Sequence, residues 1–441
     1  ETGCPLVKDN SGGSEMYRGD LEEFGTFDDF HPYCDLMFYR QTLESLAQFR
    51  QRPILLGEYN DHDVLRNLVE LKNDTPYWAS ADPELNDQGV RWQYDLPQVL
   101  AGSRFATEDD PELRAASVEK AQFVRQRVTD TVHSMPQFDG WVVTGWRHTP
   151  ISTSGVVDDS LQPIDAEATR TWTDDRLPFL IPYRRPVWKA GGNRPAHLDT
   201  QCHFAGRCSF RIGLLGDSQK LEATIGDQTQ KVEVVKSGDG SLAIGECHFS
   251  VEAGERTLTI STTSGQRDWP LWVVPQIDPG EFSEWDGSAI GLGAGAGPNV
   301  IATSLTDELL QACTNGANAI VIADGDGTAE APFWRECVHE VSDELSEFGS
   351  HWYRWCGVAT DRVLEPGYWE KHLESSRTIL NRVDTRTLSD SPLAIVGTIA
   401  KGKLVITTLR PQGGLGDQPP GIKDNPAGVA LLRALTKVRE W

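Results

Sequence analysis

The stretch Arg52-Pro53-Ile54-Leu55-Leu56-Gly57-Glu58-Tyr59-Asn60-Asp61 decides how the fold is interpreted. Its apolar run from Ile54 to Leu56 does not alternate with polar residues, which is typical of a central strand of a parallel sheet covered on both faces. Gly57 then allows close approach to the backbone. Residues at the carboxyl ends of strands form the active site of a strand-helix barrel, so Glu58 is a candidate catalytic residue. A solvated glutamate at the start of a loop is the alternative.

Length and charge narrow the classes of protein that need to be considered. A chain of 441 residues is too long for one core and should form about three domains. Its net charge of -24 argues against a nucleic-acid partner, because few cations are available to neutralise phosphates. No apolar run approaches the roughly 20 residues of a membrane span, so we expect a soluble chain without a membrane partner. Cytoplasmic and secreted locations both remain open.

The cysteines do not form a pattern that indicates a metal or a disulfide scaffold. There are eight of them in the chain, and no Cys-x-x-Cys pair occurs. Cys202 and Cys208 could form a disulfide, and two buried free thiols are an equally good interpretation. No metal and no cofactor are expected.

The first part of the chain alternates between strand and helix patterns. Around the opening stretch we expect strands at Phe27–Asp35 and Phe138–Pro150, and helices at Phe38–Phe49, Asp63–Leu71 and Pro111–Met135. A long insertion, Asn73–Asp110, separates the last two helices. Trp141 and Trp146 lie on the late strand, where an indole either stacks on a sugar or fills the core. We assign Trp141 to the core and Trp146 to a ligand platform.

Three strand-end motifs in this order resemble the glycoside hydrolases of family 2 and their barrel clan. They are His31-Pro32-Tyr33, Pro-Ile-Leu-Leu-Gly-Glu-Tyr ending around Glu58, and Gly-Trp-Val-Val-Thr-Gly-Trp followed by Arg147. The resemblance covers about the first 180 residues and implies the carboxy-terminal half of a (β/α)8 barrel. It implies that Glu58 is the nucleophile, that Tyr33 hydrogen-bonds it, and that the substrate contacts are made by four further residues: His31, Asn60, Trp146 and Arg147.

One part of that family pattern is missing. The clan carries its acid/base as an Asn-Glu pair, and no such pair precedes Glu58. Retaining hydrolysis needs two carboxyl groups about 5 to 5.5 Å apart, and Glu15 and Glu44 are poor substitutes for the second. We therefore expect this chain to be the carboxy-terminal part of a longer enzyme, close to inactive alone, whose intact parent depends on Glu58.

The rest of the chain predicts two accessory domains. Alternating strands separated by turn residues over Ala196–Val274 predict an Ig-like β-sandwich. A Gly-rich linker and a mostly parallel α/β domain with helices on both faces follow, and this domain resembles flavodoxin-like and glutamine-amidotransferase-like modules. Neither Cys313 nor Cys337 has the context of an amidotransferase nucleophile. The predicted boundaries are residues 1–182 for the barrel, 183–278 for the sandwich, 279–298 for the linker and 299–441 for the α/β domain.

The leading hypothesis is a retaining glycoside hydrolase acting on a β-linked sugar such as a β-galactoside. Its partner would be a carbohydrate substrate. A non-catalytic carbohydrate-binding pseudoenzyme and an assembly or scaffold subunit are the alternatives, and homo-oligomerisation is left open.

Overall fold

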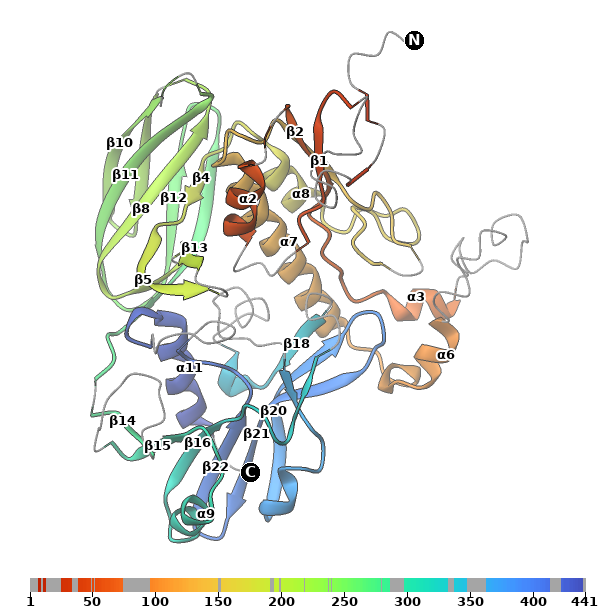
Figure 1. The fold of residues 1–441 in the computed structure, drawn as a ribbon, viewed down its shortest axis with the longest axis vertical. Coiled ribbons are helices and arrows are strands. Elements are labelled where there is room, and N and C mark those ends of the chain that lie inside the picture. Colours follow the sequence, from red (N-terminus) through yellow and green to blue (C-terminus); the bar gives the residue numbers. More distant parts are fainter. Residues whose placement is uncertain are drawn as a thin grey trace.

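A computed structural model gives a multidomain chain that combines mixed α/β units with an all-β unit (Figure 1). The residues that the structure describes are 7–8, 11–12, 25–33, 39–48, 50, 52–73, 96–149, 152–190, 194–197, 200–217, 219–236, 238, 240–278, 280–285, 297–331, 337–346, 362–412 and 422–438. Within them, three large sheets hold most of the strands. Each sheet has its own apolar core.

The N-terminal unit is built on three parallel strands in the order β1 (Asp28–Phe30), β2 (Ile54–Tyr59), β3 (Gly140–Val143). The helical elements around them are α2 (Tyr39–Ala47), α3 (Leu68–Asn73), α6 (Leu96–Ala101), η3 (Arg104–Ala106), α7 (Pro111–His133) and α8 (Ala166–Thr173). The predicted strand-helix-strand alternation is therefore present in the described part of this unit. That this unit is half of a (β/α)8 barrel stays a prediction.

One helix in this unit starts later than predicted. The expected helix over Asp63–Leu71 begins only at Leu68. Asp63 Oδ1 instead accepts hydrogen bonds from Thr153 N at 2.8 Å and Ser152 Oγ at 2.9 Å. These bonds to a distant segment compete with the local bonds of a helix, so residues 60–67 cross the interior as irregular chain.

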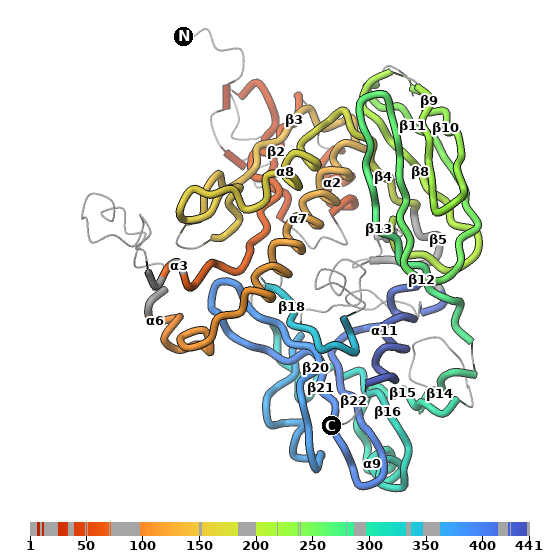
Figure 2. The backbone as a smooth tube through the Cα atoms, turned by 180° about the vertical axis from the view of Figure 1, so that it is seen from behind, coloured from red at the N-terminus to blue at the C-terminus, as the bar shows by residue number. Residues whose placement is uncertain are grey.

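Helix α7 is the longest described helix, and its sequence explains where it starts. The Asp110 carboxylate caps it by accepting the Leu113 N–H at 2.8 Å, and Pro111 occupies the first turn. Apolar side chains at helical spacing, including Val124, Val128 and Val132, pack against the three-stranded sheet. In Figures 1 and 2, α7 runs from the β-rich unit down to the C-terminal sheet, so it touches all three units.

The β-rich unit is one continuous curled sheet of eight strands, in the order β4-β8-β11-β10-β9-β12-β13-β7. The strands are β4 (Phe179–Ile181), β7 (Cys202–Phe204), β8 (Gly206–Leu215), β9 (Gln219–Ile225), β10 (Gln228–Lys236), β11 (Leu242–Val251), β12 (Gly254–Ser261) and β13 (Gln266–Val274). Strand β10 pairs with β9 over Gln228–Val234 and with β11 at Val235 and Lys236. This one strand joins both halves, so the pairing differs from the two separate sheets of an Ig-like sandwich.

The alternation that predicted this unit is present in its strands. Val232 and Val234 of β10 are buried while Glu233 is exposed, and most buried side chains of β8 to β13 meet in one apolar cluster. Strand β4, placed in the barrel by the predicted boundary at residue 182, pairs with β8 and belongs to this sheet. Cys202 and Cys208 are both buried free thiols, so the disulfide alternative is wrong.

A short two-stranded sheet, β5 (Arg184–Ala190) and β6 (Arg194–His197), lies between β4 and β7 in the chain. The second two-stranded sheet, β17 (Thr328–Glu330) with β19 (Arg362–Leu364), belongs to the C-terminal unit.

The C-terminal sheet has seven strands in the order β14-β15-β16-β22-β21-β20-β18. Its elements are β14 (Phe282–Glu284), β15 (Asn299–Ala302), α9 (Asp307–Thr314), β16 (Asn318–Ile322), β18 (Cys337–Val341), η4 (Asp343–Leu345), η5 (Glu370–His372), β20 (Ser375–Asp384), β21 (Asp390–Ile399), β22 (Gly402–Thr407), η6 (Ile422–Asp424) and α11 (Pro426–Lys437). The predicted strand-helix-strand segment corresponds to β15, α9 and β16.

Two expectations for this unit are corrected. The sheet is parallel only from β14 to β22, and the pairs β22-β21, β21-β20 and β20-β18 are antiparallel, so it is not mostly parallel. The reason is the long hairpin β20–β21, whose short turn forces neighbouring strands to run in opposite directions. The predicted linker at 279–298 also contributes an edge strand, β14, which pairs with β15.

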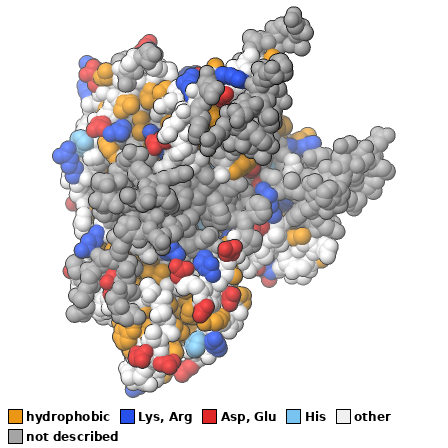
Figure 3. Space-filling view, in the orientation of Figure 1, with side chains coloured by type: hydrophobic (Ala, Val, Ile, Leu, Met, Phe, Trp, Pro, Cys, Tyr) orange, Lys and Arg blue, Asp and Glu red, His pale blue; other side chains and the backbone are white. Residues whose placement is uncertain are grey.

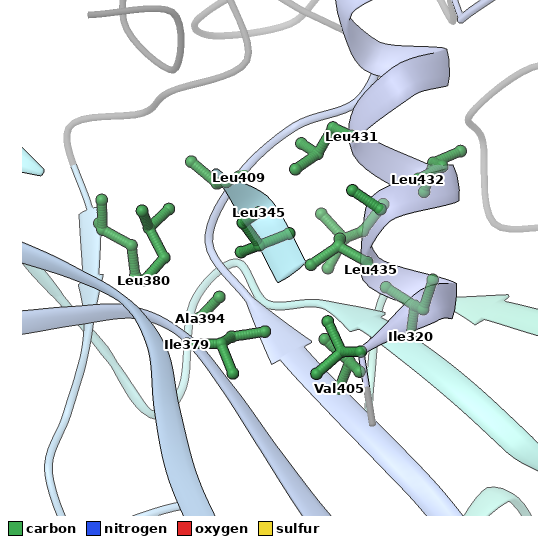
Figure 4. Close-up of a cluster of buried hydrophobic side chains, with 14 of the residues drawn as sticks. Ile320, Leu345, Ile379, Leu380, Ala394, Val405, Leu409, Leu431, Leu432 and Leu435 are labelled. Carbon is green, nitrogen blue, oxygen red and sulfur yellow. The ribbon is translucent and has the colours of Figure 1, made fainter. Parts of the chain in front are cut away.

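Helices cover both faces of the C-terminal sheet, as expected. Alternate residues of β16 face opposite ways: Ile320 belongs to the cluster beneath α11, and Val321 to the cluster beneath α9. Figure 4 shows Leu431, Leu432 and Leu435 of α11 close to strand side chains such as Ile320 and Val405. Cys313 of α9 and Cys337 of β18 are buried free thiols.

The surface and the helices add two observations. On the face shown in Figure 3, Asp and Glu side chains over the C-terminal unit lie singly among Lys and Arg, and not as one block. Among the described residues, no helix is both long enough and apolar enough to cross a membrane.

A buried ion pair should hold α7 against the β-rich unit. Arg267 Nη2 lies 2.8 Å from Asp130 Oδ1, both side chains are buried, and Arg267 Nη1 also donates to Pro178 O. Breaking such a pair leaves a buried charge, so Arg267→Met should lower the free energy of unfolding by about 3–5 kcal/mol.

Urea denaturation of this variant should be compared with that of Arg211→Met. Arg211 pairs with Glu246 at 3.1 Å on the exposed face of the β-rich unit, and its loss should cost less than about 1 kcal/mol. Equal losses for the two variants would contradict the interpretation.

Candidate functional site

The candidate site lies where β1 and β2 end at the same edge of the parallel sheet. Glu58 is the second-last residue of β2, and His31 and Tyr33 follow β1. The Tyr33 hydroxyl donates a hydrogen bond to Glu58 Oε2. The Glu58 side chain is 40% exposed and Tyr33 is 43% exposed, so both are open to a ligand. The structure thus brings together the two residues to which the sequence assigned catalytic roles.

The imidazole of His31 lies between two carboxylates. Its Nδ1 is 3.4 Å from Glu58 Oε2, and its Nε2 is 3.6 Å from Asp29 Oδ2 and 3.2 Å from Ser11 Oγ. Both ring nitrogens therefore face oxygen atoms of neighbouring side chains. His31 forms the second contact to Glu58, at the same oxygen as Tyr33.

Asp29 is a member of the site that the sequence analysis missed. It is only 4% exposed, and its Oδ2 accepts the Gly12 N–H at 2.9 Å. A signal was present, since two consecutive aspartates in a short buried strand are unusual and a buried carboxylate needs partners. Without knowing the fold, the sequence could not show that this partner set includes His31.

Gly57 makes room for Asp29. A Cβ atom at this position would lie 2.0 Å from Asp29 Oδ1, well inside contact distance. The glycine before Glu58 was expected to permit close approach, and the group that approaches it is the buried carboxylate of the neighbouring strand. The position of Asp29 therefore depends on the absence of a side chain one residue before Glu58.

Asn60, assigned to substrate binding by the resemblance, faces the protein interior. It is buried with a φ of 63°, and its Nδ2 donates to Arg125 O at 3.1 Å and to Thr129 Oγ1 at 3.2 Å, both on α7. Asparagine tolerates this left-handed conformation better than most residues do. Its described contacts turn the chain after Glu58 onto α7 and do not place it with Tyr33.

The two tryptophans of the third strand-end motif have different surroundings. Trp141 stacks on Tyr59 at 5.2 Å between ring centroids and lies 6.3 Å from Trp172, which agrees with a core role. Trp146 is 72% exposed in the loop after β3, the strand next to β2. Arg147 is half-buried beside it, bridged to Val157. Trp146 and Arg147 therefore lie after the strand adjacent to Glu58.

Buried polar groups support the loop that carries Trp146. His148 Nδ1 accepts the Gly155 N–H at 3.2 Å, so the ring is neutral at that nitrogen. Burial lowers the pKa of His148 to about 4, against an opposing effect from Asp159. Burial likewise lowers the pKa of Arg125 to about 10, partly offset by Asp61 and Asp63. Within the described residues, no group of three or more His, Cys, Asp or Glu side chains is arranged to hold a metal ion.

Comparisons with known proteins do not assign a family. No family model and no curated protein matches the chain. Solved structures that match include Bacteroides uniformis beta-glucuronidase 2, bound covalently to cyclophellitol-6-carboxylate aziridine, at 13% identity and a TM-score of 0.24, over 60% of this chain and 28% of that one. A putative beta-galactosidase from Bacteroides fragilis matches at 11% identity and a TM-score of 0.22, over 57% and 32%.

A modular endo-beta-1,4-mannanase from Cellulomonas fimi matches at 15% identity and a TM-score of 0.18, over 54% of this chain and 69% of that one. The chain spans about a third or less of the two Bacteroides enzymes. Likeness at this level carries no argument about fold or activity, so the function is argued from the site alone.

The close approach of Asp29 to Gly57 can be tested by adding one methyl group. Gly57→Ala should lower the free energy of unfolding by about 1–3 kcal/mol, because the new Cβ overlaps a buried carboxylate that cannot move freely. Gly102→Ala is the control, since its Cβ would meet Gln98 O at 3.5 Å and Val99 O at 3.7 Å, both ordinary contacts, and should change stability by less than about 0.5 kcal/mol. Chemical denaturation that shows no difference between the variants would contradict the overlap.

The buried His148 should make stability depend on pH. Its pKa of about 4 in the folded chain lies below the ordinary 6.5. Between pH 4 and pH 6.5, the unfolded chain therefore binds the proton more tightly than the folded chain does. Stability is therefore complete above pH 6.5 and is lost as the pH falls towards 4, by roughly 3 kcal/mol at 1.36 kcal/mol per pKa unit. Unfolding of the wild type and His148→Gln should be measured from pH 7 to 4, and a constant difference between them would contradict this account.

Proposed function

We propose that this chain carries the nucleophile of a retaining glycoside hydrolase that acts on a β-linked sugar, with Glu58 as that nucleophile. The observation that carries the proposal is the Tyr33 hydroxyl bound to a half-exposed Glu58 carboxylate at the carboxyl ends of two adjacent parallel strands. Carboxylates at this edge of a strand-helix sheet are placed for chemistry. The three strand-end motifs of the sequence are in keeping with this activity.

Retaining hydrolysis requires a carboxylate that is held in one orientation and has one oxygen accessible to the sugar. In retaining hydrolysis, a carboxylate oxygen bonds to the anomeric carbon while the leaving oxygen departs with a proton, and water later cleaves the glycosyl ester. Tyr33 and His31 both contact Oε2 of Glu58, which leaves Oε1 as the oxygen that would attack. Holding the carboxylate in one orientation lowers the entropy lost on reaching the transition state.

Three carboxyl groups near Glu58 in space or sequence are poor candidates for the acid/base of this mechanism. Asp29, the carboxylate that His31 links to Glu58, is buried behind the ring and is poorly placed to protonate a leaving group. Glu44 forms an ion pair with Arg40 one turn earlier on α2, and Glu15 lies outside the described residues. The proposal therefore rests on the nucleophile and not on a complete acid/base pair.

Trp146 would supply the sugar platform, and Arg147 a polar contact beside it. An exposed indole offers a flat apolar face that matches the C–H face of a pyranose ring. Its exposure of 72% without a ligand would be reduced by a bound sugar. The proposed substrate-binding set is His31, Trp146 and Arg147, with Asn60 placed behind the site by its contacts to α7.

A covalent label tests the nucleophile without needing a proton donor. In 2,4-dinitrophenyl 2-deoxy-2-fluoro-β-glycosides, the bond from the anomeric carbon to the aryl oxygen breaks and the electron pair leaves as dinitrophenolate. A bond from Glu58 Oε1 to the anomeric carbon replaces it. We expect a panel of gluco, galacto and manno reagents to include one that adds a single fluoroglycosyl group to the peptide containing Glu58.

Mass spectrometry of the digested protein identifies the labelled residue. Glu58→Gln should remove the label, while Glu44→Gln, at a half-buried carboxylate paired with Arg40 on α2, should retain it. Labelling at another residue would refute the assignment of Glu58. Saturable binding of the sugars without any labelling would instead favour the carbohydrate-binding pseudoenzyme.

A further inference from the structure

The chain that follows Glu58 is fixed to two other parts of the protein through one buried carboxylate. Asp63 has 0% exposure and uses its two oxygens differently. Oδ1 accepts from Thr153 N at 2.8 Å and Ser152 Oγ at 2.9 Å, while Oδ2 accepts from Arg386 Nε at 2.9 Å. Arg386 belongs to the turn between β20 and β21 of the C-terminal unit, 323 residues away in the chain.

We call residues 60–65 the strap, because this largely buried irregular segment follows β2, the strand that carries Glu58. Its backbone is bonded to its surroundings at several points: Val64 N donates to Thr153 O at 3.4 Å, Thr153 Oγ1 donates to Val64 O at 2.6 Å, and Leu65 N donates to Ser117 Oγ at 2.8 Å. The strap therefore binds α7 and the segment 152–154, which lies on the loop that follows Trp146.

The turn that presents Arg386 is itself well ordered by hydrogen bonds. Asp384 Oδ1 accepts the N–H groups of Arg386 at 2.9 Å and of Thr387 at 2.8 Å, and Leu388 adopts a φ of 54°. A second bridge lies nearby, where Lys120 Nζ donates to Asp63 O at 3.2 Å and to Cys337 O at 2.8 Å. The C-terminal unit therefore contacts the strap through the Arg386 side chain, which projects from a hydrogen-bonded turn. Figure 2 shows the β20–β21 hairpin below α7.

We propose that Arg386 is a positioning residue for the Glu58 site, and that one role of the C-terminal α/β unit is to hold the strap in place. This inference rests on the proposed function of Glu58. Its physical basis is that Asp63, fully buried, must remain paired, so removal of Arg386 would leave part of its charge uncompensated. The strap and the segment 152–154 would then rearrange, and with them the strand end that carries Glu58.

A purely structural role for the same contact is the competing explanation, and the chain offers a matched control for it. Arg104 also connects the N-terminal unit to the C-terminal sheet, through Glu340 at 3.0 Å and Asp390 at 3.6 Å. It has the same exposure as Arg386, 26% for each side chain, and its ion pairs within the described residues are made with Glu340, Asp390 and Asp110, outside the strap. Loss of Arg104 should weaken the interface without disturbing the site.

The experiment compares Arg386→Met with Arg104→Met in the full chain. The rate of Glu58 labelling by the reactive fluoroglycoside should fall about 10- to 100-fold in Arg386→Met, since small displacements of a reacting group have effects of this size. In Arg104→Met it should change by less than about threefold. Hydrogen exchange should become faster at the amides of Thr153, Val64 and Leu65 in Arg386→Met only.

Arg386→Lys, which keeps the charge next to Asp63, should recover much of the labelling rate. If Arg386→Met does not fold, Arg386→Gln gives the same comparison. Equal effects of the Arg386 and Arg104 substitutions on labelling and on exchange would overturn the proposal. If the wild type is never labelled, the proposed function fails, and the positioning of the strap is then decided by hydrogen exchange alone.

Discussion

A carboxylate without exposed surface determines how the units of this protein meet. Asp63 must be paired wherever it is buried, because an isolated charge in the interior costs far more than an exposed one. Its partners come from the segment at 152–154 and from the C-terminal hairpin, and its backbone carbonyl accepts from α7. The chain can satisfy this group only when all three segments are in place.

Helix α7 continues this polar interior along its length. Lys120, Arg125 and Asp130 are all buried on it and bond, respectively, to the C-terminal sheet, to the strap and to the β-rich unit. Buried polar contacts of this kind add little net stability compared with apolar packing, but they penalise every arrangement that leaves one of them unpaired. We interpret the helix as a means of specifying one relative arrangement of the three units.

Local pattern predicted those parts of the fold whose causes are local. The apolar run Ile54–Leu56, the helical spacing of apolar residues in α7 and the alternation in Val232–Val234 each depend on neighbouring residues, and each element lies where expected. The hairpin β20–β21 was missed because its strands are buried enough to resemble parallel ones. The late start of α3 was missed because its competitor, Thr153, is 90 residues from Asp63.

The residues of the candidate site also divide into those that local sequence predicts and those that it does not. Glu58 and Tyr33 were singled out because each lies at or just past the end of a recognisable strand, and parallel strands end at one edge. Asp29 and Arg386 could not, because their roles depend on which side chains the fold brings next to Gly57 and Asp63. Asn60 shows the converse: its position after Glu58 suggests the site, whereas its φ of 63° directs the chain to α7.

The three units also differ in whether the buried groups of each find their partners within the same unit. The β-rich sheet closes around one apolar cluster, and the C-terminal sheet has an apolar cluster on each face. The N-terminal unit has a smaller apolar cluster and buries Asp63 and Asp130, whose cationic partners Arg386 and Arg267 belong to the other two units. Separating it from either neighbour would therefore leave a buried carboxylate without its cationic partner. The unit that carries Glu58 thus depends on both of its neighbours for charge compensation, and a domain boundary drawn at the ends of its strands and helices would not describe a unit that is stable alone.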